Sequence, residues 1–227
     1  MSCLIKIAPS LLEADYNCLR DQLWKLEKAG AAYVHLDVMD GNFVPNLSFG
    51  MKMIQSIRPS SKLTFDVHMM VCEPLRFAHR MKEAGADVLT VHYEACHDVK
   101  ETLRAIRILG MKTGVVLKPG TPVEVLDEEI FALSDVIQLM TVEPGLEGQS
   151  FLPVSLERIA KVKNMAGKYG RDLDIEVDGD ISVKNIREVV RAGANILVSG
   201  KAAFTGDMEA NIREMKNLAQ ETLCAET

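Results

Sequence analysis

Short apolar runs alternate with longer amphipathic segments along the whole chain. Each run is five to seven residues long, and most are rich in Val, Ile or Leu. Continuous apolar runs of this length are typical of strands that are buried on both faces. The predicted strands are residues 5–9, 33–37, 63–69, 87–92, 112–117, 135–140, 174–178 and 195–199.

The segments between these runs carry apolar residues at spacings of three and four, which predicts amphipathic helices. The clearest predicted helices are residues 17–28, 75–83, 99–109, 156–168 and 183–191. Regular alternation of strands with helices predicts a parallel sheet, because each helix returns the chain to the end of the sheet at which the previous strand began.

An Ala-Gly-Ala triplet recurs where a predicted helix leads into a strand. Its glycines, Gly30, Gly85 and Gly193, lie 55 and 108 residues apart, which is two and four units of about 27 residues. Gly is favoured just past a helix end, and the chain length divided by eight is about 28 residues. We therefore predict a single (β/α)8 TIM barrel spanning residues 1–227. A doubly wound open sheet is the alternative, but no GxGxxG motif follows the first strand.

Composition and charge narrow the range of partners and locations. The 227 residues carry a formal net charge of -6 without a Lys/Arg-rich run, so neither nucleic acid nor an anionic membrane is an expected partner. The five scattered cysteines form no CxxC pair, which argues against disulfides or a structural zinc site and indicates a reducing compartment. There is no signal-peptide pattern and no apolar run near the ~20 residues of a membrane span, so we expect a cytoplasmic protein.

Polar residues stand at the carboxyl ends of the predicted strands, whereas the strand interiors are almost wholly apolar. The eight end residues are Ser10, Asp37, His68, His92, Lys118, Met140, Asp178 and Ser199. In a barrel all eight strand ends surround one mouth, which is where barrel active sites lie. The polar end residues are therefore expected to meet in one cleft.

Four of the polar strand residues suggest a metal centre. His35 and Asp37 are two apart on one strand, so they point to the same face, and His68 and Asp178 occupy comparable strand ends. Any one of them alone is as readily explained as a core group with satisfied hydrogen bonds. Together, two imidazoles and two carboxylates suit one divalent ion, with zinc, iron, manganese or cobalt as candidates.

Three segments near the mouth could hold an anion. A glycine-rich segment, residues 143–151, follows the sixth strand, and residues 178–180 and 199–201 follow the seventh and eighth. Glycines let backbone N–H groups approach an anion, and phosphate is often held at that part of a barrel. Three strand-end methionines, at positions 39, 70 and 140, would either fill the barrel or form an apolar ceiling that excludes water.

Seven segments resemble one known family, in the family's order and over nearly the whole chain. They are residues 8–12, 35–46, 66–70, 85–92, 140–145, 177–179 and 198–200, of which 35–46 is the most specific. On these motifs the sequence resembles the ribulose-phosphate 3-epimerase family. The resemblance implies interconversion of D-ribulose 5-phosphate and D-xylulose 5-phosphate by metal-assisted proton transfer at C3.

The resemblance also implies residue roles. His35, Asp37, His68 and Asp178 would bind the metal, and Asp37 and Asp178 would also act as the acid/base pair. Ser10 resembles a substrate-hydroxyl contact. The expected substrate-binding residues are Ser10, Met39, His68, Met70, Met140, Gly145, Leu146, Glu147, Gly148, Gly179, Asp180, Ser199, Gly200 and Lys201.

The chemistry explains why such residues are needed. A C–H proton beside a ketone is weakly acidic, and a divalent cation can stabilise the enediolate as a Lewis acid. Inversion of the carbon requires proton removal from one face and delivery to the other, so one carboxylate must stand on each side. Asp37 and Asp178 come from the second and seventh predicted strands and could flank the substrate in this way.

The phosphate region departs from the family pattern at three positions. The family usually has Gly where this chain has Glu147 and Asp180, and Ser where it has Lys201. Carboxylates repel phosphate and a lysine attracts it. Our hypothesis is that Lys201 either pairs with Asp180 or reaches the anion directly.

These departures leave other functions open. The substrate could be a related ketose, such as D-allulose 6-phosphate, or a ketose without phosphate. A lyase using Lys118 or Lys201 as a Schiff base, a magnesium-dependent decarboxylase and a non-enzymatic phosphosugar-binding protein are the remaining alternatives. We also expect a homo-oligomer.

Overall fold

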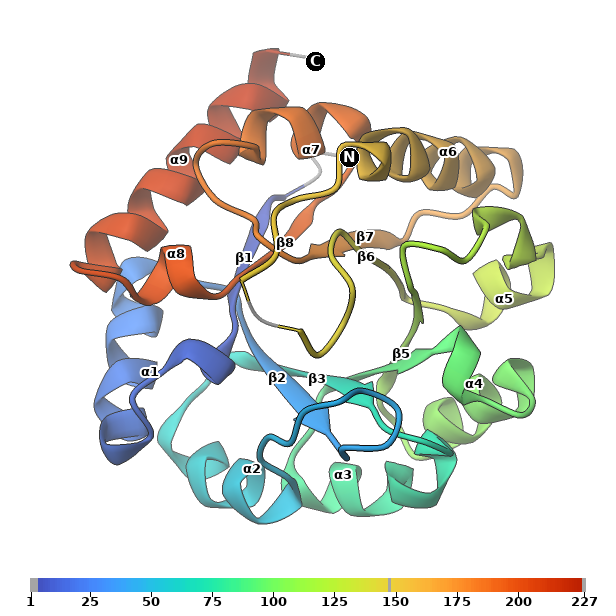
Figure 1. Cartoon of the computed structure of the whole chain (residues 1–227), viewed down its shortest axis with the longest axis horizontal. Helices are drawn as coiled ribbons and strands as arrows, with labels where there is room; N and C mark the ends of the chain where they lie inside the picture. Colours follow the sequence, from blue (N-terminus) through green and yellow to red (C-terminus); the bar gives the residue numbers. More distant parts are fainter. Residues whose placement is uncertain (1–3, 147, 226–227) are drawn as a thin grey trace.

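The computed structural model describes residues 4–146 and 148–225. Eight parallel strands follow one another around a barrel: β1 (Lys6–Pro9), β2 (Tyr33–Met39), β3 (Thr64–Met70), β4 (Val88–His92), β5 (Lys112–Leu117), β6 (Val136–Met140), β7 (Asp174–Asp178) and β8 (Ile196–Ser199). Each pairs with the next from β2 to β8, and β8 pairs with β1. A parallel bridge between Ser10 and His35 joins β1 to β2. The predicted (β/α)8 TIM barrel is confirmed (Figure 1).

Helices surround the strands on all sides (Figure 1). They are α1 (Leu19–Ala29), α2 (Met51–Ile57), α3 (Ala78–Ala84), α4 (Val99–Ile108), α5 (Glu128–Leu133), α6 (Val154–Lys168), α7 (Ile186–Ala192), α8 (Lys201–Phe204) and α9 (Met208–Ala225). Short 3-10 turns are η1 (Leu11–Glu13), η2 (Tyr16–Cys18), η3 (Arg58–Ser60), η4 (Pro74–Phe77), η5 (Tyr93–Ala95) and η6 (Val123–Val125). Within the described ranges no helix is both long and apolar enough to cross a membrane.

The Ala-Gly-Ala triplets do mark helix ends. Gly30, Gly85 and Gly193 follow α1, α3 and α7 with φ values of 88°, 103° and 118°. L-residues with a side chain rarely adopt this left-handed region, so glycine is the favoured residue there. At Gly85 a side chain would also meet Arg58, since an added Cβ would lie 2.5 Å from its Cγ.

Two layers of buried side chains, one on each face of the strands, explain why the strands are continuous apolar runs in the sequence. Alternate strand residues such as Leu36 and Val67 pack outward against the helices in the main hydrophobic core. The intervening residues fill the barrel, where Tyr33, Val88 and Ile196 form an apolar floor. Both faces of each strand are therefore buried, which is why the strands appear in the sequence as continuous apolar runs.

Above the apolar floor the barrel interior becomes polar. Asp66, Thr90, Gln138 and Glu176 are fully buried at mid-height. The parallel register places His35 beside Asp66 and Asp37 beside His68. The polar layer thus leads directly from the barrel interior to the residues at its mouth.

Candidate metal centre and active site

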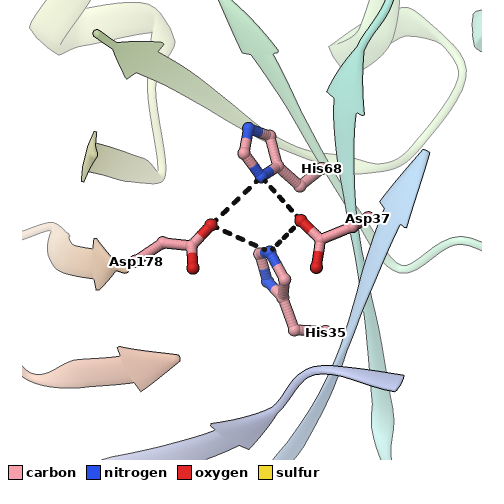
Figure 2. A group of neighbouring side chains, drawn as sticks. All are labelled: His35, Asp37, His68 and Asp178. Atoms are coloured by element: carbon pink, nitrogen blue, oxygen red, sulfur yellow. Dashed lines mark hydrogen bonds and ion pairs between the residues drawn. The ribbon is translucent and has the colours of Figure 1, made fainter. Parts of the chain in front are cut away.

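Four side chains converge at the end of the barrel interior. His35 and Asp37 come from β2, His68 from β3 and Asp178 from β7, and one donor atom from each lies within 4.8 Å of the others. Figure 2 shows the carboxylates and the rings alternating around one centre. Sequence reasoning predicted all four as neighbours, and the structure brings them together.

The donor atoms alternate in chemical character. His35 Nε2 lies 3.4 Å from Asp37 Oδ1 and 3.6 Å from Asp178 Oδ2. His68 Nδ1 lies 3.2 Å and 3.3 Å from the same two oxygens. His35 Nε2 is buried without a hydrogen-bond partner, as expected of a nitrogen whose lone pair is reserved for a cation. This cluster can hold a divalent metal ion, for which mixed nitrogen and oxygen donors are suited.

The charges of the cluster depend on one another. Burial alone would raise the pKa of Asp37, but the neighbouring His35 and His68 outweigh it and hold that pKa below its ordinary value. The pKa of Asp178 is also lowered, by hydrogen bonds from the same histidines against the effect of burial. Burial would lower the pKa of His68, yet the two carboxylates raise it to about 9. A cation entering the site would therefore displace protons from the rings, since only neutral imidazole ligates metal.

A second buried group stands behind His35. Its Nδ1 lies 2.7 Å from Asp66 Oδ2 and 3.2 Å from Glu176 Oε1. Burial and the adjacent Asp66 raise the pKa of Glu176 to about 8, so this carboxyl is largely protonated at neutral pH. An Nδ1–H bonded to Asp66 directs the lone pair of His35 Nε2 toward the metal centre.

Asp66 and Glu176 were not among the predicted site residues. The available signal was their spacing, since each lies two residues before a predicted ligand on the same strand and so faces the same side. Strand-end positions alone did not reveal this second group, because it lies within the barrel.

A cavity of about 220 Å³ opens above the cluster. Most of the predicted substrate-binding residues line it: Ser10, Met39, Met70, Met140, Gly145, Leu146, Gly148, Gly179, Asp180, Gly200 and Lys201, together with Asp37 and Asp178. The polar residues Glu13, Asn46, Glu143 and Gln149 also line the cavity, although none was among the expected substrate-binding residues. Asn46 and Glu143 lie in motifs used for the family resemblance, and Glu143 and Gln149 lie in the predicted anion-binding segment 143–151.

Two predicted contacts within the described residues, His68 and Ser199, stand apart from the cavity lining. His68 is fully buried beneath the cavity, where it reaches the metal centre. Ser199 is also buried, and its hydroxyl donates to the Ile181 carbonyl at 2.9 Å, so it supports the loop after β7. Glu147 lies outside the described residues.

Ser10 lines the cavity, and its expected contact with a substrate hydroxyl stays a prediction. Its hydroxyl donates to Asp37 Oδ2 at 2.5 Å, while Asp37 Oδ1 faces the histidines. The two oxygens of Asp37 are thus differentiated, one facing the metal centre and one held at the cavity wall.

Hydrogen bonds hold Asp180, in the predicted phosphate region, in a left-handed backbone conformation. This residue has φ of 52°, a conformation that favours Gly and that Asp tolerates better than most residues. Its Oδ2 accepts the Phe151 N–H at 3.1 Å, and its carbonyl accepts from Asn185 at 2.8 Å. No ion pair joins Lys201 to Asp180 in the described parts of the chain, so that half of our hypothesis is wrong. Lys201 is instead exposed on the cavity wall.

An apolar group borders the cavity. Met39 and Met70 pack with Val44 in a small cluster at the mouth. A Cβ on Gly145 would lie 2.4 Å from Val44 Cβ, so the loop after β6 packs closely on the segment after β2. The loop after β6, yellow in Figure 1, projects over the barrel opening.

The fold and the buried His/Asp cluster at the barrel mouth define a (β/α)8 protein with the layout of an enzyme. The model of the Ribulose-phosphate 3 epimerase family matches residues 6–204. The chain therefore belongs to the ribulose-phosphate 3-epimerase family of carbohydrate isomerases. This confirms the resemblance noted from the sequence motifs.

Curated relatives are similar over nearly their full lengths. The ribulose-phosphate 3-epimerase of Bacillus subtilis is 44% identical, with 94% of this chain and 99% of the relative covered. The enzyme of the same name from Synechocystis is 43% identical, with 90% and 89% covered. That of Aquifex aeolicus is 39% identical, with 93% and 96% covered.

Solved structures of more distant proteins share the fold. A mutant tryptophan synthase α-subunit from Pyrococcus furiosus has a TM-score of 0.67 at 16% identity, with 98% of each chain covered. A thiamine phosphate pyrophosphorylase from the same organism has a TM-score of 0.62 at 13% identity, also with 98% of each chain covered. At these identities the likeness concerns the barrel alone.

Proposed function

We propose that this protein interconverts D-ribulose 5-phosphate and D-xylulose 5-phosphate by moving a proton at C3. One observation carries the assignment: Asp37 and Asp178, from different parts of the barrel wall, face each other across one buried centre beneath an open cavity. Inversion at carbon needs a proton acceptor on one face and a donor on the other. The names of the similar proteins support the same reaction.

The two carboxylates would take alternate roles. One begins charged and removes the C3 proton, while the other begins protonated and delivers a proton to the opposite face. The Ser10 hydroxyl holds one oxygen of Asp37 at 2.5 Å, which keeps that carboxylate oriented toward the substrate. The reverse reaction exchanges the two roles.

His35, Asp37, His68 and Asp178 would hold one divalent ion, with zinc, iron, manganese or cobalt as candidates. When bound, such an ion supplies Lewis-acid stabilisation of the negative charge that develops as the C3 proton leaves. Asp66 would keep the His35 imidazole in the ligating tautomer. The apolar surfaces of Met39, Met70 and Met140 would limit access of water to the reacting carbon.

The anion site is proposed on the part of the cavity wall formed by the loops after β6, β7 and β8. Backbone near Gly145, Gly148, Gly179 and Gly200 lines this wall, and glycines allow N–H groups to approach a phosphate. Lys201 is exposed on the same wall. Because Glu143 and Asp180 also line it, we assign Lys201 the role of a direct phosphate contact that offsets their repulsion.

The remaining assignments follow from these. Lys201 in the cavity lining favours a phosphorylated substrate over a free ketose. A lyase that uses Lys118 as a Schiff base is disfavoured, because Lys118 does not line the cavity and its Nζ lies 3.9 Å from the Phe43 ring centroid. We further propose that residues 1–227 form one domain, that the protein acts in the cytoplasm and that it forms a homo-oligomer.

Proton NMR in deuterated water tests the reaction. Metal-loaded protein is mixed separately with D-ribulose 5-phosphate, D-allulose 6-phosphate and the two unphosphorylated ketoses. Deuterium at C3 together with the epimer is expected with D-ribulose 5-phosphate, and turnover of the free ketoses is expected to be much slower. Preferred turnover of D-allulose 6-phosphate would reassign the substrate, and neither exchange nor epimer with any sugar would overturn the epimerase assignment.

A further inference from the structure

A third histidine, His92 at the end of β4, lies directly behind His68. It is fully buried, and its Nε2 lies 2.9 Å from His68 Nε2. The ring centroids are 5.0 Å apart with an angle of 31° between the ring planes. His92 is not one of the four residues around the proposed metal centre, so its contact with His68 needs a separate explanation.

The ring nitrogen that His68 presents to the metal centre determines which histidine donates the hydrogen bond between His68 and His92. Its Nδ1 lies near Asp37 and Asp178, so Nδ1 must carry the lone pair when a cation is bound. A neutral His68 then carries its proton on Nε2. That N–H donates to His92 Nε2, which must accept and so leaves the His92 proton on Nδ1.

Glu94 completes the chain at the far side of His92. Its Oε2 lies 3.3 Å from His92 Nδ1, where it accepts that proton's hydrogen bond. Its Oε1 accepts the Lys118 backbone N–H at 2.9 Å and the Thr121 hydroxyl. These contacts hold the Glu94 carboxylate beside His92.

Packing holds the middle residue as well. The Phe43 ring lies 4.8 Å from the His92 ring, centroid to centroid, and Lys118 Nζ lies 3.9 Å from the centre of Phe43. The opposite arrangement of protons would place two N–H groups against each other at 2.9 Å, or else put a proton on His68 Nδ1 and block the metal centre. The contacts therefore support one tautomer of each ring.

We propose that Glu94 and His92 form a positioning relay that holds His68 in the orientation and tautomer that bind the metal ion. The relay rests on the proposed metal centre, because its purpose is to present His68 Nδ1. Neither residue touches the substrate cavity, so both are positioning residues. Groups that hold a ligating imidazole from behind typically account for about 10- to 100-fold in metal affinity.

Two variants break the relay at different points. His92→Phe keeps a ring of similar size but cannot accept the His68 N–H. Glu94→Gln keeps an oxygen for Lys118 and Thr121, but turns its amide N–H groups toward His92 Nδ1. Each is expected to weaken Zn²⁺ binding by about 10- to 100-fold. His92→Gln offers an amide oxygen to His68, so its Zn²⁺ affinity is expected to stay closer to the wild type.

The measurement is competition for Zn²⁺ between the apoprotein and a chromophoric chelator. His79→Phe and Glu124→Gln are the matched controls, because both residues are exposed and form only surface ion pairs, and both are expected to bind as the wild type does. Thermal unfolding of each apoprotein identifies any variant that fails to fold. Folded His92→Phe and Glu94→Gln proteins with wild-type Zn²⁺ affinity would overturn the relay.

Nitrogen-15 NMR of the histidine rings separates this proposal from the proposed function. The relay requires a proton on His92 Nδ1 and on His68 Nε2 in the apoprotein, and a His92 protonated on Nε2 instead would overturn it. Wild-type protein that binds no Zn²⁺ would refute the metal centre. Even then, protons found on His92 Nδ1 and His68 Nε2 would show that Glu94 and His92 hold His68 in the proposed tautomer.

Discussion

Asp37 and Asp178 each place one oxygen within 3.3 Å of the same atom, His68 Nδ1, although they come from strands that are not neighbours in the sheet. Strands β1 and β8 lie between them on the shorter path around the barrel. The curvature of the barrel therefore brings the two carboxylates face to face (Figure 2). An open sheet would not bring them together in this way.

Replacing either carboxylate should separate proton exchange from epimerisation. We expect Asp37→Asn and Asp178→Asn each to lower kcat for epimerisation by about 10²- to 10⁴-fold, because each removes one acid/base group. The remaining carboxylate should still exchange deuterium into one epimer, and the two variants should differ in which epimer they label. Proton NMR in deuterated water measures both quantities.

The exposed Asp21→Asn on α1 serves as the control and should retain full activity. A variant at either site that epimerises at the wild-type rate would show that its carboxylate is not needed for proton transfer. Because both asparagines could also weaken metal binding, rates are compared at saturating metal.

Metal removal should lower thermal stability as well as activity. A ligand present at 100 times its Kd stabilises the folded state by about 2.7 kcal/mol, which corresponds to roughly 5–10 °C in Tm for a chain of this size. Dialysis against a chelator should lower Tm by this amount, and Zn²⁺, Mn²⁺ or Co²⁺ should restore it. The Asp178→Asn variant should show a much smaller restoration, and equal restoration there would place the ion elsewhere.

Lys201 should act on the phosphate group alone. We expect Lys201→Ser to raise KM for the phosphorylated ketose about 10- to 100-fold, since one charge-assisted contact is worth roughly 1.5–3 kcal/mol, while the slow turnover of the free ketose should not change. Initial rates with both substrates measure the difference. Lys184→Ser removes another exposed lysine and should alter neither KM, and an unchanged KM in Lys201→Ser would exclude the phosphate contact.

Strand patterns carried most of the fold information. The eight predicted runs match β1 to β8 closely, because strands buried on both faces leave a continuous apolar signal. Helices α2, α5, α8 and α9 were not among the predicted helices. The first three have only four to seven residues, which give few turns in which a period of 3.6 can be recognised, whereas α9, with 18 residues, lies after the last predicted strand.

The candidate site was predictable mainly at the strand ends. Asp37, His68 and Asp178 follow from topology, because parallel strands bring their carboxyl ends together, and His35 follows from its two-residue spacing to Asp37. The relay could not be predicted in the same way. His92 was visible as a strand-end residue, but its contact with His68 depends on ring orientation, and that of Glu94 depends on the 3-10 turn η5.

Two glycines after β6 allow the loop contact to be tested. Gly145 and Gly148 both have positive φ, 77° and 71°, so an alanine at either position is strained. Only at Gly145 would the new Cβ collide with Val44, at 2.4 Å, whereas nothing lies within 4 Å at Gly148. We expect Gly145→Ala to cost roughly 1–3 kcal/mol more in stability than Gly148→Ala. Denaturant unfolding measures both, and equal losses would show that the loop does not pack on Val44.

Glu94 should make stability depend on pH in the acid range. Burial alone would raise its pKa, but hydrogen bonds from His92, Thr121 and the Lys118 amide outweigh this and lower the pKa to about 2, from an ordinary value of 4.5. A carboxyl with a lowered pKa stabilises the folded state above its unfolded pKa, and that stability is lost as pH falls through the folded pKa. The contribution at neutral pH is on the order of 3 kcal/mol.

The test compares wild type with Glu94→Gln, because the amide cannot lose a proton. Wild-type protein should be the more stable above about pH 5, and the difference in unfolding free energy should shrink steadily between about pH 4.5 and pH 2. Burial lowers the pKa of His92 to about 4 against the opposing effect of Glu94, so both proteins also lose stability through His92 as pH falls below the ordinary pKa of histidine. Glu124→Gln, at an exposed site, should show only a small difference across the same range. A wild-type advantage that stayed constant down to pH 3 would mean that Glu94 does not carry its charge in the hydrogen-bonded form seen here.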